Sequence, residues 1–362
     1  MTEIHPDHEA VRAEIAEAKL PDPEHHDLKK LPPPHIHWLR RIAIWLGGLV
    51  VLLILVFAVG YLRFSWQNKI LLWPAKVLPY PVSIVGGEWL SYYDYQADVP
   101  NITQYVERNS PPDAEVTRNM SLDVYSRKII LNKMIGEEII NKIGLAKKLT
   151  VTQADIDKTY QNYVTQAGST EAEISDTIKT LYNWSVDEFK QKLISSQVIQ
   201  EKLAESYFAE VKNQVEQLRT EILKDPKTFG EVAKTQSDDT SAAKGGLIEP
   251  MNTAALKTAY SDSAAQIESL KVGEISNVLE TSRGYEIVYL EKKEAAKKTA
   301  DGNMFTLRVI SKMPDYNTWI QDLVNAEIKK SRIIVFEPRF RWEADCGILT
   351  KAEPSCKTTA SN

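Results

Sequence analysis

Two stretches of the sequence decide the fold: FGEVAKTQSDDTSAAKGGL at residues 229–247 and LKVGEISNVLETSRGYEIVYL at residues 270–290. The first ends in Gly245–Gly246, and such a pair permits positive φ and a tight turn into a strand. In the second, the isoleucine and tyrosine residues of 285–289 favour strand formation. The pattern predicts an α+β fold with a small antiparallel sheet covered by helices.

Five motifs follow one another in this part of the chain. They are Phe229–Ala233, Ser237–Asp239, Lys244–Leu247, Leu270–Ile275 and Gly284–Val288. Together they resemble the parvulin type of peptidyl-prolyl isomerase. The resemblance implies a parvulin-like domain over residues 206–312 that acts on proline-containing polypeptides.

The same resemblance implies a set of site residues. Asp239 matches the family position beside the bound proline, and Leu256, Tyr260 and Met251 match the region of the proline pocket. Glu286 stands where the family has its second active-site histidine, and the chain lacks both family histidines. Isomerisation breaks no bond, so a titrating base is not obligatory and activity is still expected.

A strand is also predicted at Met304–Lys312, MFTLRVISK, after a polar linker. No strand signal precedes the first helix of the parvulin-like segment, where the family has its first strand. We therefore expect the late strand to take that place in permuted order and to pair with Ile287–Leu290. Arg308 would then occupy the position of the family's first histidine and count as a catalytic residue.

The acidic side chains in this segment have alternative interpretations. The run Ser237–Asp239 is either part of the site or an ordinary helix N-cap. Asp239 and Glu286 could lie close together, which would raise the pKa of one of them. The simpler expectation, which we favour, is that Glu286 points to solvent from an edge strand.

The preceding residues indicate a mainly helical domain. Leu131, Ile135, Ile139 and Ile143 form one stripe of an amphipathic helix, and Gly144 suits a helix end.

Two capping-box patterns, Thr152 with Asp155 and Ser185 with Glu188, predict further helix starts.

This order of elements resembles the N-terminal chaperone domain of the SurA, PrsA and PpiD group of extracytoplasmic foldases. The resemblance implies a chaperone domain built from residues 82–205 and 313–337. The parvulin-like segment would then be an insertion, with Val82–Val85 pairing near Ile333–Phe336.

Residues 42–62 carry no charge and are long enough to cross a bilayer as one helix. We expect residues 1–41 to form a disordered cytoplasmic tail and residues 63–81 a juxtamembrane linker. The slight excess of Lys and Arg before the span favours a cytoplasmic N-terminus in the inner membrane and an extracytoplasmic C-terminal domain. A buried core helix is the alternative.

The reactive side chains are confined to the two ends of the chain. All six histidines lie in the first 37 residues, and both cysteines, Cys346 and Cys356, lie in the last 17. Histidine- or cysteine-dependent catalysis and a zinc site therefore have no residues in the folded part, and no cofactor or metal is expected.

The cysteine pair itself lies in a predicted C-terminal tail, residues 338–362. Two cysteines ten positions apart in a tail suggest a disulfide in an oxidising compartment, with two free thiols as the alternative.

The sequence thus predicts a single-pass membrane protein of the PpiD type. Its expected partners are unfolded or nascent polypeptides, the lipid bilayer and the translocation machinery. A net charge of −5 argues against nucleic acid. Two alternatives remain: a non-catalytic holdase with a degenerate parvulin domain, and a structural subunit of an envelope complex.

Overall fold

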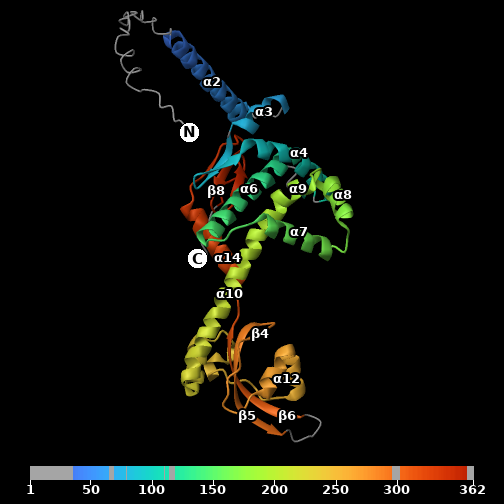
Figure 1. The fold of residues 1–362 in the computed structure, drawn as a ribbon, viewed down its shortest axis with the longest axis vertical. Helices are drawn as coiled ribbons and strands as arrows, with labels where there is room; N and C mark the ends of the chain where they lie inside the picture. The colour runs from blue at the N-terminus through green and yellow to red at the C-terminus, as the bar shows by residue number, and fades with distance from the viewer. Residues whose placement is uncertain are drawn as a thin grey trace, which may run out of the picture. The chain divides into compact units, whose positions relative to one another are not determined.

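A computed structural model describes residues 36–64, 69–78, 80–109, 111–113, 119–295 and 302–356. The chain divides into two compact units, Met1–Ala58 and Val59–Asn362. Most of the predicted cytoplasmic tail, residues 1–35, lies outside the described residues. Figure 1 shows the course of the chain.

Helix α2, Ile36–Phe64, begins before the predicted span. Its segment Ile44–Tyr61 has a mean hydropathy of 2.6, and only 11% of it is buried. By length and composition it could cross a membrane. The predicted linker that follows contains a second helix, α3, Lys69–Val77.

A three-stranded antiparallel sheet has the order β2-β1-β7. Its strands are β1 Pro81–Val85, β2 Glu88–Ser91 and β7 Ile333–Val335. Ser83 pairs with Val335 and Val85 with Ile333. The expected pairing of the two distant strands is therefore confirmed.

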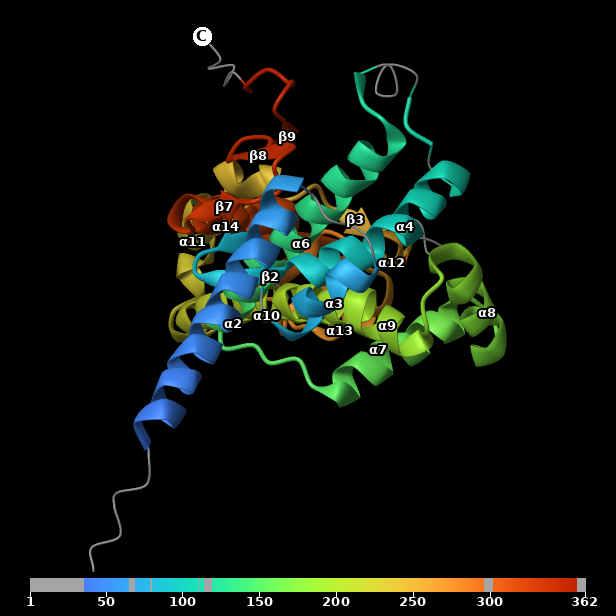
Figure 2. The same ribbon diagram turned by 90° about the horizontal axis from the view of Figure 1, so that it is seen from above.

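Helices α4 and α6 pack against this sheet, as Figure 2 shows, and further helices pack against α4, α6 or one another. Their bounds are α4 Tyr92–Asn109, α6 Leu122–Ala146, α7 Gln153–Gln166, α8 Glu171–Tyr182, α9 Val186–Phe189, α10 Ser195–Lys224 and α14 Tyr316–Lys330. The predicted stripe on α6 is buried at all four positions. The helical character expected for this part of the chain is confirmed.

Both predicted capping boxes are present, at Thr152 and Ser185, and a third occurs at Thr170. Gly144 does not end its helix, because α6 continues to Ala146. A Cβ at Gly144 would lie 2.5 Å from Cδ1 of Ile199 on α10. This glycine therefore permits close helix packing, and the expectation of a helix end was wrong.

Helix α10 follows α9 through one turn of π-helix, Lys190–Ile194. Near the start of α10, Val198 packs into a core with side chains of α7 and α8. Farther along the helix, Val215 and Ile222 belong to a different core, beneath a four-stranded sheet described next. One continuous helix thus contributes to two separate hydrophobic cores.

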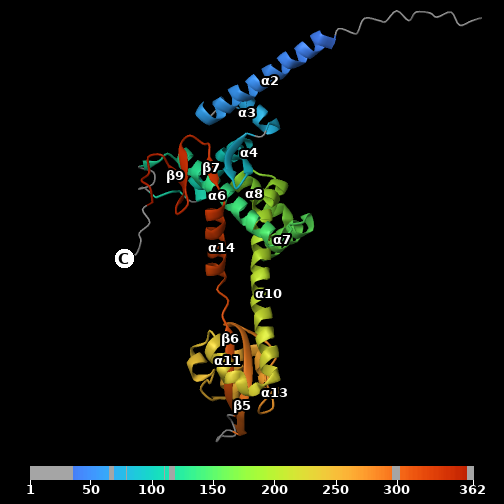
Figure 3. The same ribbon diagram turned by 90° about the vertical axis from the view of Figure 1, so that its left-hand side faces the viewer.

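The second sheet has four antiparallel strands in the order β3-β6-β5-β4. Their bounds are β3 Met251–Asn252, β4 Leu279–Thr281, β5 Gly284–Ala295 and β6 Asn303–Lys312. The sheet is covered by α10, α11 Phe229–Gln236, α12 Thr253–Tyr260 and α13 Ala264–Ser269. In Figure 3, α11 and α13 lie on opposite sides of it.

Strands β5 and β6 pair over most of their length, with Ile287 opposite Ile310 and Leu290 opposite Leu307. The predicted pairing of the late strand is thus present. Gly245 and Gly246 have φ values of +66° and +75°, and a Cβ at Gly246 would lie 2.4 Å from the Val309 oxygen. The glycine pair lets the preceding loop meet β6 directly.

The predicted C-terminal tail contains a hairpin, β8 Phe340–Glu343 and β9 Gly347–Thr350. Ile348 is fully buried, and its amide donates to Oδ1 of Asn132 on α6 at 2.9 Å. The expectation of a plain tail was therefore wrong for this hairpin. A disulfide joins Cys346 and Cys356, whose Cα atoms are 6.3 Å apart.

Candidate functional site

Strand β5 places its side chains alternately on two covered faces of the four-stranded sheet. Val288 and Leu290 belong to a core shared with α12 and α13. Ile287 belongs to a core shared with α10 and α11, and Tyr285 and Tyr289 pack against that core. By this alternation Glu286 lies on the α12–α13 face, next to apolar side chains.

Glu286 is completely buried. Its Oε2 accepts a hydrogen bond from Nη2 of Arg283 at 2.9 Å, and its Oε1 lies 2.8 Å from Nε of Arg283 in an ion pair. Ser311 Oγ donates to Oε1 at 3.4 Å. The favoured prediction of a solvent-facing glutamate on an edge strand is wrong. Strand β5 pairs with β6 along one edge and with β4 along the other, so β5 is a central strand.

Burial raises the pKa of the Glu286 carboxyl, because an ionised carboxylate loses hydration in the interior. The Arg283 guanidinium opposes this shift, and the charge of Asp239 adds slightly to it. Both carboxylates of the predicted pair interact with the same guanidinium, that of Arg283.

Asp239 is the N-cap of a short 3₁₀ turn, Thr240–Lys244, and its Oδ1 accepts from the Ser241 amide at 2.7 Å. Burial raises the pKa of Asp239. Hydrogen bonding from Ser241 and the charge of Arg283 outweigh burial, so the pKa is lowered overall. Asp239 is thus a capping residue that also lies near Arg283.

The predicted proline-pocket residues are mostly buried. Leu256 has no exposed surface, Tyr260 is 3% exposed, and both belong to the core on the α12–α13 face. Met251 packs against the same core from β3 and is partly exposed.

The Tyr260 ring lies 5.6 Å from the Arg283 guanidinium carbon. Burial raises the pKa of the Tyr260 hydroxyl, so this group remains a hydrogen-bond donor at neutral pH.

Arg308 does not join these residues, which corrects the prediction that placed it in the site. It pairs with Tyr289 on the opposite face, donates to the Gly245 oxygen at 3.0 Å and forms an ion pair with Glu291 at 2.9 Å. The residue of β6 opposite Glu286 is Ser311. Arg308 and Ser311 are three positions apart on β6, and side chains an odd number of positions apart on a strand lie on opposite faces of the sheet. This explains the error.

The site is therefore a polar cluster of Asp239, Tyr260, Arg283, Glu286 and Ser311. Sequence reasoning missed Arg283 and Ser311. The signal for Arg283 was present, since an arginine in the turn three residues before a strand glutamate can fold back onto it. Ser311 could be found only with the β5–β6 register in hand.

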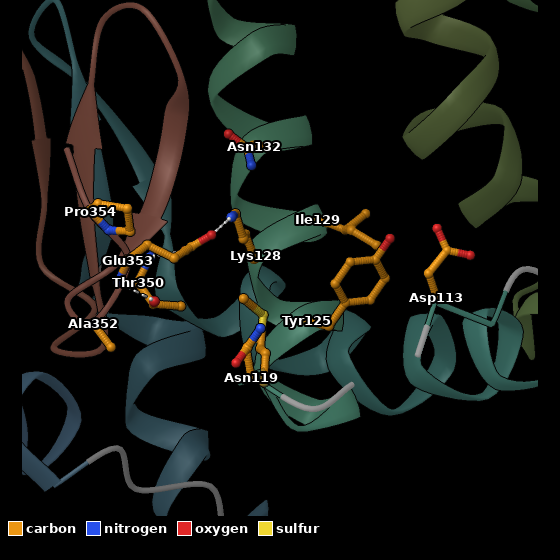
Figure 4. Close-up of a pocket in the computed structure, with 11 residues that line it drawn as sticks. Asp113, Asn119, Tyr125, Lys128, Ile129, Asn132, Thr350, Ala352, Glu353 and Pro354 are labelled. Carbon is orange, nitrogen blue, oxygen red and sulfur yellow. Dashed lines mark hydrogen bonds and ion pairs between the residues drawn. The ribbon is translucent and has the colours of Figure 1, made fainter. Parts of the chain in front are cut away.

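A separate groove of about 670 Å³ lies between α6 and the C-terminal hairpin. In Figure 4, Tyr125 and Ile129 point toward Asp113, whereas Lys128 points to Glu353 and forms an ion pair of 2.7 Å. The groove thus has a partly apolar lining from α6 and a polar bridge to the hairpin.

Comparison with known proteins places four of the five residues of the polar cluster within a recognised domain. Residues 198–292 match the model of the rotamase family, described as the PPIC-type PPIASE domain. The matched range contains Asp239, Tyr260, Arg283 and Glu286. It ends before β6, so Ser311 and Arg308 lie outside it.

The curated relatives include the foldase protein PrsA from Staphylococcus aureus strains RF122 / ET3-1 and Newman. Each is 27% identical over 188 residues, which is 45% of this chain and 57% of the relative. The matched part therefore spans little more than half the length of these relatives.

Two solved structures are also similar. PrsA from Bacillus subtilis is 19% identical and covers 60% of this chain and 80% of its own, with a TM-score of 0.19. A structure reported for the SurA-like chaperones PEB4 and Cj1289 of Campylobacter jejuni is 14% identical. It covers 70% of this chain and 98% of its own, with a TM-score of 0.23.

Proposed function

We propose that the chain is a foldase that binds unfolded polypeptides and accelerates the cis–trans isomerisation of their prolyl bonds. The observation that carries this proposal is the rotamase-family match of residues 198–292, which contains four members of the polar cluster. In this proposal, residues 206–312 form the isomerase domain. Residues 82–205 and 313–337 form the chaperone domain into which it is inserted.

The chemistry requires stabilisation of a twisted amide. Resonance gives the peptide bond a rotation barrier of about 18–20 kcal/mol, and a site that binds the twisted form better than either planar form lowers it. The Arg283 side chain is 43% exposed and offers N–H donors at the edge of the apolar α12–α13 core. We assign it the role of hydrogen-bond donor to the twisted bond.

The other members of the cluster position this donor. Glu286 holds the guanidinium through one hydrogen bond and an ion-pair contact, and Ser311 donates a hydrogen bond to Glu286. Asp239 contributes a second negative charge near Arg283. Tyr260 offers a ring against which the guanidinium rests and which a proline could contact at its edge. Arg308 has no part in this arrangement.

The test is NMR exchange spectroscopy on an Ala-Pro-Phe-type peptide with the full chain in a mild detergent. Wild-type protein is expected to accelerate exchange, and Arg283→Gln is expected to lose most of it, about 10-fold or more for one preorganised donor. Arg332→Gln is the matched control, because Arg332 is exposed and lies beside the other sheet. A folded wild-type protein without acceleration would refute the isomerase proposal.

A second candidate function, holding unfolded chains without catalysis, is favoured by the groove between α6 and the C-terminal hairpin. Suppression of aggregation of a denatured test protein measures it. The double variant Tyr125→Ser, Ile129→Ser should weaken suppression, whereas Tyr163→Ser on α7 should leave it unchanged. Equal suppression by all three proteins would exclude this groove as the holding surface.

We further propose that α2 anchors the chain in the inner membrane with the N-terminus in the cytoplasm. The apolar segment Ile44–Tyr61 supports the anchor, and the preceding Lys and Arg residues support the direction. Such a tether would hold the foldase near emerging chains at the translocation machinery. Resistance to carbonate extraction tests the anchor. Digestion of a C-terminal epitope tag by protease added to spheroplasts tests the direction, because only an extracytoplasmic C-terminus is then accessible, and full protection would refute it.

A further inference from the structure

A second hollow, of about 330 Å³, adjoins the polar cluster. The turn between β4 and β5 forms one wall with Thr281 and Arg283, and Phe208 of α10 and Pro314 complete it with Tyr285. Arg283 therefore borders both this hollow and the polar cluster. We name the hollow the Phe208 groove.

Phe208 is held in place by other aromatic rings although 38% of it is exposed. Its ring centroid is 5.5 Å from that of Tyr207 and 6.1 Å from that of Tyr316. Tyr207 in turn stands 4.7 Å from Trp319, and its hydroxyl accepts from the Asp315 amide at 2.9 Å. A fixed and exposed aromatic ring is a typical anchor for a binding partner.

The floor of the groove is also tightly built. A Cβ at Gly284 would lie 2.3 Å from the Lys312 oxygen and 2.7 Å from Cδ of Pro314. The β4–β5 turn is thus in direct backbone contact with the segment that carries Pro314. The floor of the groove is therefore formed by closely packed backbone.

The charges around the groove are compensated by neighbours in the chain. Arg283 is paired with Glu286, and Glu280 forms an ion pair with Lys212 at 2.8 Å. With these charges paired, the exposed rings and Pro314 favour an uncharged, apolar occupant over a carboxylate or an ammonium group.

We infer that the Phe208 groove is a subsite for an aromatic side chain of the client polypeptide, next to the proline that is isomerised. This inference rests on the proposed function. Neighbouring side chains of an extended peptide are only a few ångströms apart, and Arg283 links the groove to the cluster. A prolyl bond held at Arg283 therefore places a neighbouring residue beside the groove that Arg283 also lines.

The test compares two peptides of identical composition, Ala-Ala-Phe-Pro-Phe-Ala-Ala and Phe-Ala-Ala-Pro-Ala-Ala-Phe, on the full chain in detergent. Binding and prolyl exchange are both measured by NMR. The wild-type protein should favour the first peptide by about 2- to 10-fold, as one aromatic contact allows. Phe208→Ala should reduce this ratio to near one without changing the result for the second peptide.

Val272→Ala is the control, because it removes an exposed apolar side chain of the same region that does not line the groove. A preference that survives Phe208→Ala, or an equal loss with both peptides, overturns the inference. Acceleration without any preference refutes the subsite but leaves the isomerase proposal standing. Preferential binding that requires Phe208 without acceleration supports the subsite and refutes the isomerase.

Discussion

At the scale of single residues, the feature that distinguishes this chain is a buried carboxylate on an apolar sheet face. Glu286 has no exposed surface and shares its face with Val288 and Leu290. Its hydration is replaced by a two-point contact with Arg283 and a hydroxyl from Ser311. Since burial still dominates, the pKa of Glu286 is raised, and this has a consequence for stability.

We predict that Glu286→Gln gains stability relative to wild type as the pH rises. A raised pKa in the folded state gives a stabilisation that is complete below the ordinary value of 4.5 and is lost as the pH rises through the folded value. Glutamine does not titrate, so it avoids this loss. Urea unfolding of both proteins between pH 4 and 7 measures the trend.

The control for this series is Glu249→Gln, an exposed carboxylate outside the cluster. Measuring it across the same pH range separates the effect of Glu286 from that of removing one surface charge. If the curves for Glu286→Gln and wild type run parallel, ionisation of Glu286 carries no net cost in the folded protein.

At the scale of elements, the contact between α6 and α10 depends on one glycine. We predict that Gly144→Ala destabilises the protein by about 1–3 kcal/mol, although alanine is the better helix former. The added Cβ would meet Ile199 at 2.5 and 2.9 Å. Adding Ile199→Val, which removes the nearer atom, should recover part of the loss in urea unfolding.

Gly136 on the same helix provides the matched comparison. A Cβ there meets nothing within 4 Å, so Gly136→Ala should stabilise by up to about 1 kcal/mol. If Gly144→Ala behaves like Gly136→Ala, the close approach of α6 and α10 has no energetic weight.

At the scale of the whole molecule, the C-terminal residues pack on a helix from the first half of the chain. We predict that the double variant Cys346→Ser, Cys356→Ser speeds hydrogen exchange at Ile348 and Leu349. The disulfide stabilises the hairpin by closing a short loop, which contributes about 3 kcal/mol at most, and the variant loses this contribution. Exchange in β5 and β6 should not change. Unaltered protection of the hairpin would mean that its contacts with α6 suffice.

Local signals predicted much of this fold, and non-local ones were the source of error. The α6 stripe, the capping boxes at Thr152 and Ser185 and the turn at Gly245–Gly246 depend on short windows of sequence, and all were predicted, whereas the third capping box, at Thr170, was missed. The placement of Glu286 depended on a strand that follows it in the chain. The face of Arg308 depended on the β5–β6 register, and a one-residue slip reverses it.

The C-terminal hairpin was missed for a related reason. The hairpin is buried by α6, which is far away in sequence. Its own residues show no clear alternation of apolar and polar side chains that would indicate a strand. Within the site, the types of residue near a proline pocket could be anticipated from the motifs. Their mutual contacts could not, because the members of the polar cluster come from five separate segments of the chain.

The pairing of β1 with β7 sets an order of events during synthesis. Ser83 Oγ donates to the Ile334 oxygen across 251 positions of the chain. At about 5–20 residues per second, the ribosome needs roughly 10–50 s to supply this partner. All strands of the four-stranded sheet lie between Met251 and Lys312. All four of these strands are therefore synthesised before β7, and during that interval β2 is the only partner that the chain has supplied for β1 in the three-stranded sheet.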